Sequence, residues 1–292
     1  MADHVNEALQ GLIAGKNIPA EVDYLRSGSA NGPITAFLFS VSGPRIEIRN
    51  VEFPGAGPEE LAELEASGNL LRGEDYLRSA LQAQVNLEFL PVYLKRGYLK
   101  ASFSEPEATV VQNTGQQTTV DVKFPVTPNL QYKVTGDRWT GNTAFSSDSL
   151  QSLIHLAPGK PVNAVQLNDD LGTIRHLYGT KGFMAAQITP VPAMDDAQAT
   201  VAYEIKVNEG AVYKMGDLTI SGVDSRTMDR LNLAWKLRPG QTYDSSYAGK
   251  FLDETTSLLP EGRWKTTVHE SPNRDHTVDV TLRYEQKGPE LP

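Results

Sequence analysis

Apolar and polar residues alternate in pairs of short segments, and these pairs recur along the chain. Three segments that close such a pair, TTVDVKFPV, ATVAYEIKV and HTVDVTLRY, align without gaps at residues 118–126, 199–207 and 276–284. Apolar residues at every second position are typical of a strand with one buried face. Turn-forming residues separate each segment from the alternating segment before it, so we predict an antiparallel hairpin at each of the three places. Residues 32–41, GPITAFLFSV, fit a fourth copy of the closing strand.

A helical pattern precedes each hairpin. Leu167, Leu171, Ile174 and Tyr178 are spaced as on one face of a helix. In the first copy Pro91 interrupts the pattern, whose longer period predicts an insertion or a kink. The helices end at the similar phrases VYLKRGYLKA, LYGTKGFMAA and LLPEGRWKT, each with a glycine. Glycine favours a left-handed helix cap, so we expect it to turn the chain directly into the next strand.

A shorter helix and an opening strand come earlier in each copy. The predicted opening strands are residues 45–53, 132–139 and 213–221, and the predicted short helices are residues 59–66, 147–155 and 225–235. The order in each copy is therefore strand, helix, helix, strand, strand. Residues 1–44 fit only the second half of a further copy, without the first strand and first helix.

These patterns predict an α+β fold of tandem β-α-α-β-β units, each a three-stranded mixed sheet with two helices on one face. The predicted domains are a truncated half unit at 1–44 and complete units at 45–130, 131–211 and 212–292. If the first strand pairs with the last, the last strand is central and the second strand becomes an edge of the sheet.

The ordered set of motifs resembles the POTRA domain family. A Gly-x-x-Tyr turn precedes the longer helix at residues 73–76 and 240–243, and Gly-Tyr or Gly-Phe follows that helix at residues 97–98 and 182–183. The segment VNEGAVY at 207–213 resembles the family's junction between units. The resemblance covers residues 45–292; residues 128–130 and Arg263 depart from the junction and glycine motifs.

Tandem POTRA units of the BamA and TamA type are periplasmic arms of outer-membrane β-barrel proteins. The resemblance implies capture of unfolded outer-membrane protein segments, docking of accessory assembly lipoproteins, and attachment to the outer membrane through a C-terminal β-barrel. The last predicted strand ends at residue 284, so we expect this chain to be the periplasmic part without its barrel. A natural soluble POTRA protein is the alternative. For the function, the alternative is a structural arm that docks accessory lipoproteins or spaces a barrel from the cell wall.

The predicted site is the unpaired edge of each sheet, because an edge strand can pair with an incoming extended segment. We expect these edges at residues 98–104, 183–189 and 263–269. The residues predicted to pair with a client are Tyr98, Leu99, Lys100, Ala101, Ser102, Phe183, Met184, Ala185, Ala186, Gln187, Arg263, Trp264, Lys265, Thr266 and Thr267. Outward Lys100, Lys265 and His269 would guide acidic or extended clients; the alternative is that they protect the edge from aggregation. An inter-unit hinge is predicted at Glu209, Gly210 and Ala211.

Composition narrows the function further. The chain has 292 residues, 39% hydrophobic and 22% charged, with a net charge of −9, which argues against nucleic acid as a partner. It has no cysteine, which fits the cytoplasm or the periplasm. The five histidines lack metal-site spacing, and we expect His155 at a helix end and Asp169 and Asp170 on an exposed helix face. No nucleotide-binding or hydrolase motif is present, so we expect neither a cofactor nor an enzyme.

Overall fold

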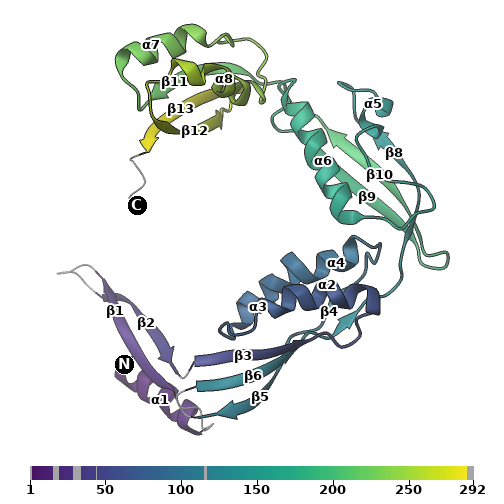
Figure 1. The fold of residues 1–292 in the computed structure, drawn as a ribbon, viewed down its shortest axis with the longest axis vertical. Coiled ribbons are helices and arrows are strands. Elements are labelled where there is room, and N and C mark those ends of the chain that lie inside the picture. Colours follow the sequence, from purple (N-terminus) through teal and green to yellow (C-terminus); the bar gives the residue numbers. More distant parts are fainter. Residues whose placement is uncertain (1, 16–19, 29–33, 44, 115–116, 288–292) are drawn as a thin grey trace. The chain divides into compact units, whose positions relative to one another are not determined.

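In the computed structural model, the structure describes residues 2–15, 20–28, 34–43, 45–114 and 117–287. The chain divides into two compact regions, Met1–Gln131 and Tyr132–Pro292. Figure 1 shows their helices and strands coloured along the sequence.

The same three-stranded sheet occurs three times, in the orders β3-β6-β5, β8-β10-β9 and β11-β13-β12. In each, the last strand of the copy is central, parallel to the first strand and antiparallel to the second. The strands are β3 (Arg45–Glu52), β5 (Glu107–Asn113), β6 (Gln117–Lys123), β8 (Lys133–Thr140), β9 (Gln187–Asp195), β10 (Thr200–Asn208), β11 (Lys214–Ser221), β12 (Arg263–Pro272) and β13 (Thr277–Lys287). The predicted fold class and the central position of the last strand are confirmed.

Two helical stretches lie on one face of each sheet (Figure 1). The first sheet carries α2 (Pro58–Asn69) and a longer stretch formed by α3 (Arg78–Gln84), the π-helix η1 (Val85–Phe89) and α4 (Leu90–Leu94). The second carries α5 (Ser147–Gln151) and α6 (Ala164–Gly179), and the third α7 (Ser225–Ala234) with α8 (Tyr247–Thr255) and the 3₁₀ turn η2 (Thr256–Leu258). The helix predicted at 147–155 is shorter than expected, because the chain leaves helical geometry after Gln151.

The core of each sheet lies between its central strand and the helices. Alternate residues of the central strands, and Phe124 directly after β6, are buried, each with at most 8% of its surface exposed: Val120, Val122, Phe124, Val201, Tyr203, Ile205, Val207, Val278, Val280, Leu282 and Tyr284. They are the apolar positions of the three aligned segments, so the predicted alternation is confirmed. Burial of side chains of this size stabilises each unit by roughly 1.5–3 kcal/mol per residue.

The N-terminal part contains α1 (Ala2–Gly15) and an antiparallel hairpin of β1 (Glu21–Gly28) and β2 (Ile34–Ser42). The order helix, strand, strand is that of the second half of a unit. Residues 32–33 of the predicted strand at 32–41, and 115–116 of the first unit's hairpin turn, lie outside the described residues.

The interruption predicted at Pro91 is the π-helix η1. One turn of π-helix accommodates an extra residue without breaking the helix. Pro91 follows as the second residue of α4, so the irregular π turn lies where a proline lacks the helical N–H and where its ring would clash with a regular α-helical turn. The buried residues Val85, Phe89 and Val92 therefore still face the core on both sides of the interruption.

Gly97 and Gly182 are the predicted left-handed caps, with φ of 89° and 85°. The next residue donates its N–H back into the helix in both copies: Tyr98 to the Tyr93 carbonyl and Phe183 to the Tyr178 carbonyl, each at 3.1 Å. In each copy, a carbonyl near the helix end that would lack a helical partner thereby accepts a hydrogen bond.

The prediction that the strand begins directly after this glycine is wrong in the first two copies. Tyr98 stacks edge-on against Tyr93, and Phe183 against Tyr178, with ring centroids 5.8 Å apart in each pair. Because the aromatic ring is held against the helix, the chain makes one more turn before the strand. In the first copy the Ala101 N–H closes this turn by donating to the Tyr98 carbonyl at 3.1 Å. Arg263 replaces the aromatic in the third copy, and there the strand begins at once.

Candidate functional site

The two outer strands of each sheet differ in how their edges are covered. In the second sheet Val134 of β8 donates its N–H to the Lys160 carbonyl at 2.9 Å and accepts the Gly159 N–H at 2.7 Å. The glycine turn before the second helix thus pairs with the edge of the first strand. Ile48 and Met215 make the corresponding bonds in the other two sheets. This part of each first strand is therefore closed to a further strand.

The second strands β5, β9 and β12 each pair with one neighbour within the described part of the chain, the central strand of their own sheet. Their other edge carries backbone N–H and C=O groups directed away from the sheet. Such a row is a template for an extended segment. The candidate site is therefore these three edges.

The structure distributes the predicted pairing residues differently from the expectation. Arg263, Trp264, Lys265, Thr266 and Thr267 all lie in β12. Gln187 opens β9, but residues 183–186 form the turn before it. Residues 98–101 form the equivalent turn, and Ser102 lies in the two-residue strand β4 (Ser102–Phe103), which pairs with β7 (Val126–Thr127). Edge positions are thus corrected to 107–113 and 187–195 in the first two sheets.

Sequence reasoning missed the exposed apolar residues of these displaced edges. Val110 and Val111 of β5 are 61% and 42% exposed, and Val191 and Met194 of β9 are each 38% exposed. The β-branched pair in EATVVQN was the available signal. The glycine phrase predicts too early a start for the strand, so this pair falls outside the predicted edge at residues 98–104.

The β12 edge has a charged outer face and a bond to its own core. Lys265 and His269 are exposed on the face away from the helices. Glu270 accepts a hydrogen bond from the Tyr243 hydroxyl at 2.7 Å. Burial, reinforced by the nearby Glu270 carboxylate, raises the pKa of Tyr243 well above its usual range. Tyr243 therefore remains a protonated donor that anchors β12 near its C-terminal end.

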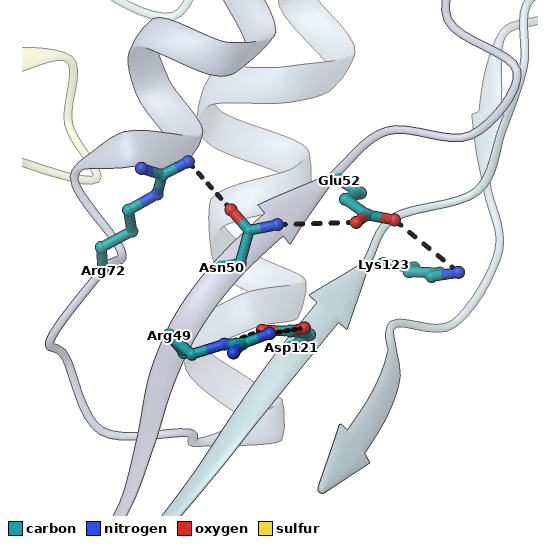
Figure 2. Close-up of polar contacts among 6 residues, drawn as sticks. All are labelled: Arg49, Asn50, Glu52, Arg72, Asp121 and Lys123. Atoms are coloured by element: carbon teal, nitrogen blue, oxygen red, sulfur yellow. Dashed lines mark hydrogen bonds and ion pairs between the residues drawn. The ribbon is translucent and has the colours of Figure 1, made fainter. Parts of the chain in front are cut away.

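A polar network of two separate groups lies on the open face of the first sheet, on β3 and β6, and reaches the loop after α2 (Figure 2). One group is the pair of Arg49 and Asp121; the other runs from Arg72 in that loop through Asn50 and Glu52 to Lys123. Arg49 donates two hydrogen bonds to the Asp121 carboxylate, at 2.8 and 2.5 Å, and lowers the pKa of Asp121. Exposed pairs of this kind contribute little stability. They give this face a fixed arrangement of charges that the sequence patterns did not predict.

The predicted hinge residues are held on both sides. Glu209 accepts the N–H groups of Thr143 and Ala144, each at 2.7 Å. Burial alone would raise the pKa of Glu209, but these hydrogen bonds outweigh it and lower the pKa. Beyond Gly210, which has φ of 70°, Tyr213 donates its N–H to the Gly182 carbonyl at 2.8 Å. Any pivot is confined to the few residues between these anchors.

Two predictions about acidic residues and histidine are wrong. Asp170 is buried, with 4% of its surface exposed, and His155 lies beyond the end of α5. The Asp170 carboxylate accepts the His155 backbone N–H at 2.7 Å and the Gln166 amide at 2.9 Å, and lies 2.8 Å from His155 Nδ1. Because α5 ends at Gln151, His155 lies beyond its last turn, and Asp170 holds that segment through the His155 backbone N–H. The helix-face pattern could not show this, because it depends on a helix that ends early.

Among the described residues, no group of histidine, aspartate and glutamate side chains could hold a metal ion. Within the same part of the chain, no helix has the length and apolar character needed to cross a membrane.

Part of the chain matches a known family model, and the chain has relatives among known proteins. Residues 132–210 match the family model POTRA, described as "Surface antigen variable number repeat". A putative outer membrane protein assembly factor of Treponema pallidum is 24% identical over 67% of this chain and 23% of its own length. The outer membrane protein assembly factor BamA of Buchnera aphidicola is 21% identical over 66% of this chain and 34% of its own length. The chain therefore spans about a quarter of the first relative and about a third of the second.

The fold has a solved counterpart. The crystal structure of Haemophilus influenzae BamA POTRA3-5 covers 82% of this chain and 96% of its own, with a TM-score of 0.62 and 21% identity. Its similarity lies in the fold, a succession of mixed α+β units. The homologues are assembly factors and not known enzymes. Residues 132–210 thus match the POTRA family model, and the chain is similar to outer membrane protein assembly factors in sequence and to the POTRA domains of BamA in fold.

Proposed function

We propose that this chain acts in the periplasm as the substrate-binding arm of an outer-membrane β-barrel assembly protein, capturing unfolded outer-membrane protein segments by strand addition. Its units would be residues 45–130, 131–211 and 212–292, following a half unit at 1–44. In the full-length protein the arm would be attached to the outer membrane through a C-terminal β-barrel.

The observation that carries this proposal is the asymmetry of the sheet edges. The glycine turns pair with the outer edges of β3, β8 and β11, whereas β5, β9 and β12 have a free edge within the described residues. Pairing through the main chain gives affinity with little demand on sequence. That property suits a carrier that accepts many different barrel strands.

A second candidate function is a docking arm for accessory assembly lipoproteins. The polar network on the open face of the first sheet favours it, because fixed and exposed charges give a partner a specific pattern to complement (Figure 2). In this case side chains, and not backbone groups, would decide binding.

A backbone-specific titration tests the proposal. The full chain, labelled with ¹⁵N, is titrated with a peptide that copies an outer-membrane strand, and with the same peptide N-methylated at every second residue. Methylation removes peptide donors while leaving the side chains unchanged. We expect amide shifts at one or more of 107–113, 187–195 and 263–272 with the first peptide, and a loss of those shifts with the second.

Equal shifts with both peptides would contradict strand addition, because binding would not depend on backbone donors. An absence of amide shifts at all three edges, with the peptide in excess, would also contradict strand addition. Shifts that instead follow an accessory lipoprotein on the face of β3 and β6 would favour the docking arm.

A further inference from the structure

The hairpin of β12 and β13 determines which backbone groups of β12 point outward. Asn273 donates its N–H to the Thr277 carbonyl at 2.8 Å, so this opposed pair is hydrogen-bonded. Bonded and non-bonded pairs alternate along an antiparallel ladder, and the β12–β13 register runs without a shift from Pro272 to Arg263. Lys265, Thr267 and His269 therefore bond to β13. The N–H and C=O groups of Trp264, Thr266, Val268 and Glu270 face outward.

The equivalent row on β9 is blocked by two prolines. Val268 lies opposite Leu282, and Pro190 lies opposite Ile205, which is the residue aligned with Leu282 on the central strand. In the same way, Glu270 lies opposite Val280 and Pro192 lies opposite Tyr203, the residue aligned with Val280. Proline has no N–H, and within sheets it is tolerated where that N–H would face away from the ladder. The outward row of β9 thus lacks donors at two successive positions.

The β5 edge is interrupted in a different way. Its register with β6 shifts between Val110 and Gln112, which is a β-bulge. A bulge twists the strand and breaks the regular spacing of its free groups, and natural edges use it to discourage pairing. Of the three second strands, β12 alone combines an unshifted register with four consecutive outward residues that all carry an N–H.

The surroundings of β12 favour one kind of partner. On the helix side, a recess of about 290 Å³ lies against the edge; Leu252, Leu259, Trp264 and Tyr284 line it together with the polar residues Asp253 and Glu261. On the opposite side, exposed Lys265 and His269 flank the strand. An added strand sends alternate side chains to the two sides. One set would enter the recess between α8 and β12, and the other would meet the basic side chains.

We propose that β12 is the edge on which a client strand pairs, and that it selects extended segments with apolar residues at alternate positions and acidic or polar residues between them. The inference rests on the proposed function and narrows it to a single strand. The prolines of β9 and the bulge of β5 keep the other two edges from competing for the segment.

Amide hydrogen exchange on the full chain provides the first test. The probe is a blocked ten-residue peptide that alternates valine with glutamate and threonine. We expect the amides of Trp264, Thr266, Val268 and Glu270 to become protected when the peptide binds. The amides of Thr267 and His269 bond to β13 already, so their protection should change little. This pattern separates strand addition from a contact with the face of the sheet.

A matched pair of variants provides the second test. Val268→Pro removes the outward N–H, as Pro190 does in β9, whereas Val268→Ala shortens the side chain and keeps the N–H. We expect Val268→Pro to weaken peptide binding by about tenfold or more, because a peptide carbonyl loses its donor. Val268→Ala should stay within about threefold of the unchanged chain, since no backbone hydrogen bond is lost. The reciprocal variant Pro190→Val with Pro192→Glu should create new protection in β9.

The outcomes separate this inference from the proposed function. Binding that protects 107–113 or 187–195 in the unchanged chain would overturn the assignment to β12 while leaving strand addition intact. Equal losses in Val268→Pro and Val268→Ala would also overturn it. No protection at any edge would contradict both proposals. If Val268→Pro does not fold, the exchange pattern of the unchanged chain and the β9 variant still decide between these results.

Discussion

Gly222 holds a backbone position that other residues cannot take. Its φ is 87°, and a Cβ at this position would collide with the Tyr284 carbonyl oxygen of the central strand. Gly55 and Gly141 stand at the same place in the other two copies; Gly55 faces the Val126 carbonyl in β7, and Gly141 faces the Val207 carbonyl in the central strand β10. A single residue type thus lets the end of the first strand approach the core in all three units.

We expect Gly222→Ala to lower the unfolding free energy of the third unit by more than the cost of left-handed backbone geometry alone. Left-handed geometry costs an L-residue about 1–2 kcal/mol, and the collision adds to that cost. Gly240→Ala is the control, because Gly240 has φ of 84° and no atom within 4 Å of an added Cβ. Denaturant unfolding should show a clearly larger loss for Gly222→Ala. Equal losses would mean that the close approach to Tyr284 is unimportant.

Asp170 makes the stability of the second unit dependent on pH. Burial alone would raise its pKa, but hydrogen bonds from Gln166 and His155 outweigh this and lower it from 3.8. A group with a lowered folded-state pKa stabilises the fold above its unfolded value and loses that contribution as the pH falls through the folded value. The contribution should therefore be complete near neutral pH and disappear below pH 3.8.

Asp170→Asn should cost about 1.5–3 kcal/mol at neutral pH, the range for hydrogen bonds to a charged group. The variant should also lose less stability than the unchanged chain between neutral and acidic pH, because it has no carboxylate there to protonate. Thermal unfolding across this range measures both effects. Parallel curves for the two proteins would show that Asp170 does not carry the acid sensitivity.

At the scale of elements, the π-helix η1 allows the helical stretch to continue past Pro91. Deleting Leu87, which is 72% exposed, would remove the extra residue of η1 and place Pro91 inside a continuous α-helix. A proline in a helix interior costs about 3 kcal/mol or more. We expect the deletion to be strongly destabilising by itself and to be rescued by Pro91→Ala, as measured by thermal unfolding followed by circular dichroism. A deletion that Pro91→Ala fails to rescue would show that η1 serves a purpose other than accommodating the proline.

The elements were largely predictable because each rests on a local signal. The closing strands follow from alternation at positions such as Val278, Val280 and Leu282, and the caps follow from Gly97 and Gly182. Their order then predicts which strand is central. The starts of β5 and β9 were not predictable from the same phrase, because contacts of Tyr98 and Phe183 with their own helices add a turn.

The type of candidate site, an unpaired strand edge, could be predicted from the sequence, but its position along the chain could be predicted only in part. Alternation shows that a second strand exists, and topology makes it an edge. Which groups of that strand point outward depends on the bonded pair Asn273–Thr277, a detail of the turn that no periodicity reveals. The role of Pro190 and Pro192 likewise depends on which side of the strand they occupy.

At the scale of the whole molecule, the junction after the second unit is held by Glu209. Glu209→Ala should free the loop at 141–145, and amide exchange at Thr143 and Ala144 should accelerate by about tenfold or more, since bonds to a charged acceptor are lost. Glu204→Ala is the matched control, because Glu204 pairs with exposed Arg138 at 3.2 Å on the sheet surface. Unchanged exchange in Glu209→Ala would show that the loop is held by other contacts.

The parallel pairing of the first and last strands has a consequence for the order of folding. β12 and β13 are joined by a short turn, whereas β11 reaches β13 only after two helices have intervened. Contacts between distant residues form more slowly, because a longer loop must close first. In pulse-labelled refolding we expect the amides of β12 and β13 to be protected before those of β11. The opposite order would contradict this. A ribosome makes the first strand of each repeat earliest, so the strand synthesised first would be the last to find its place.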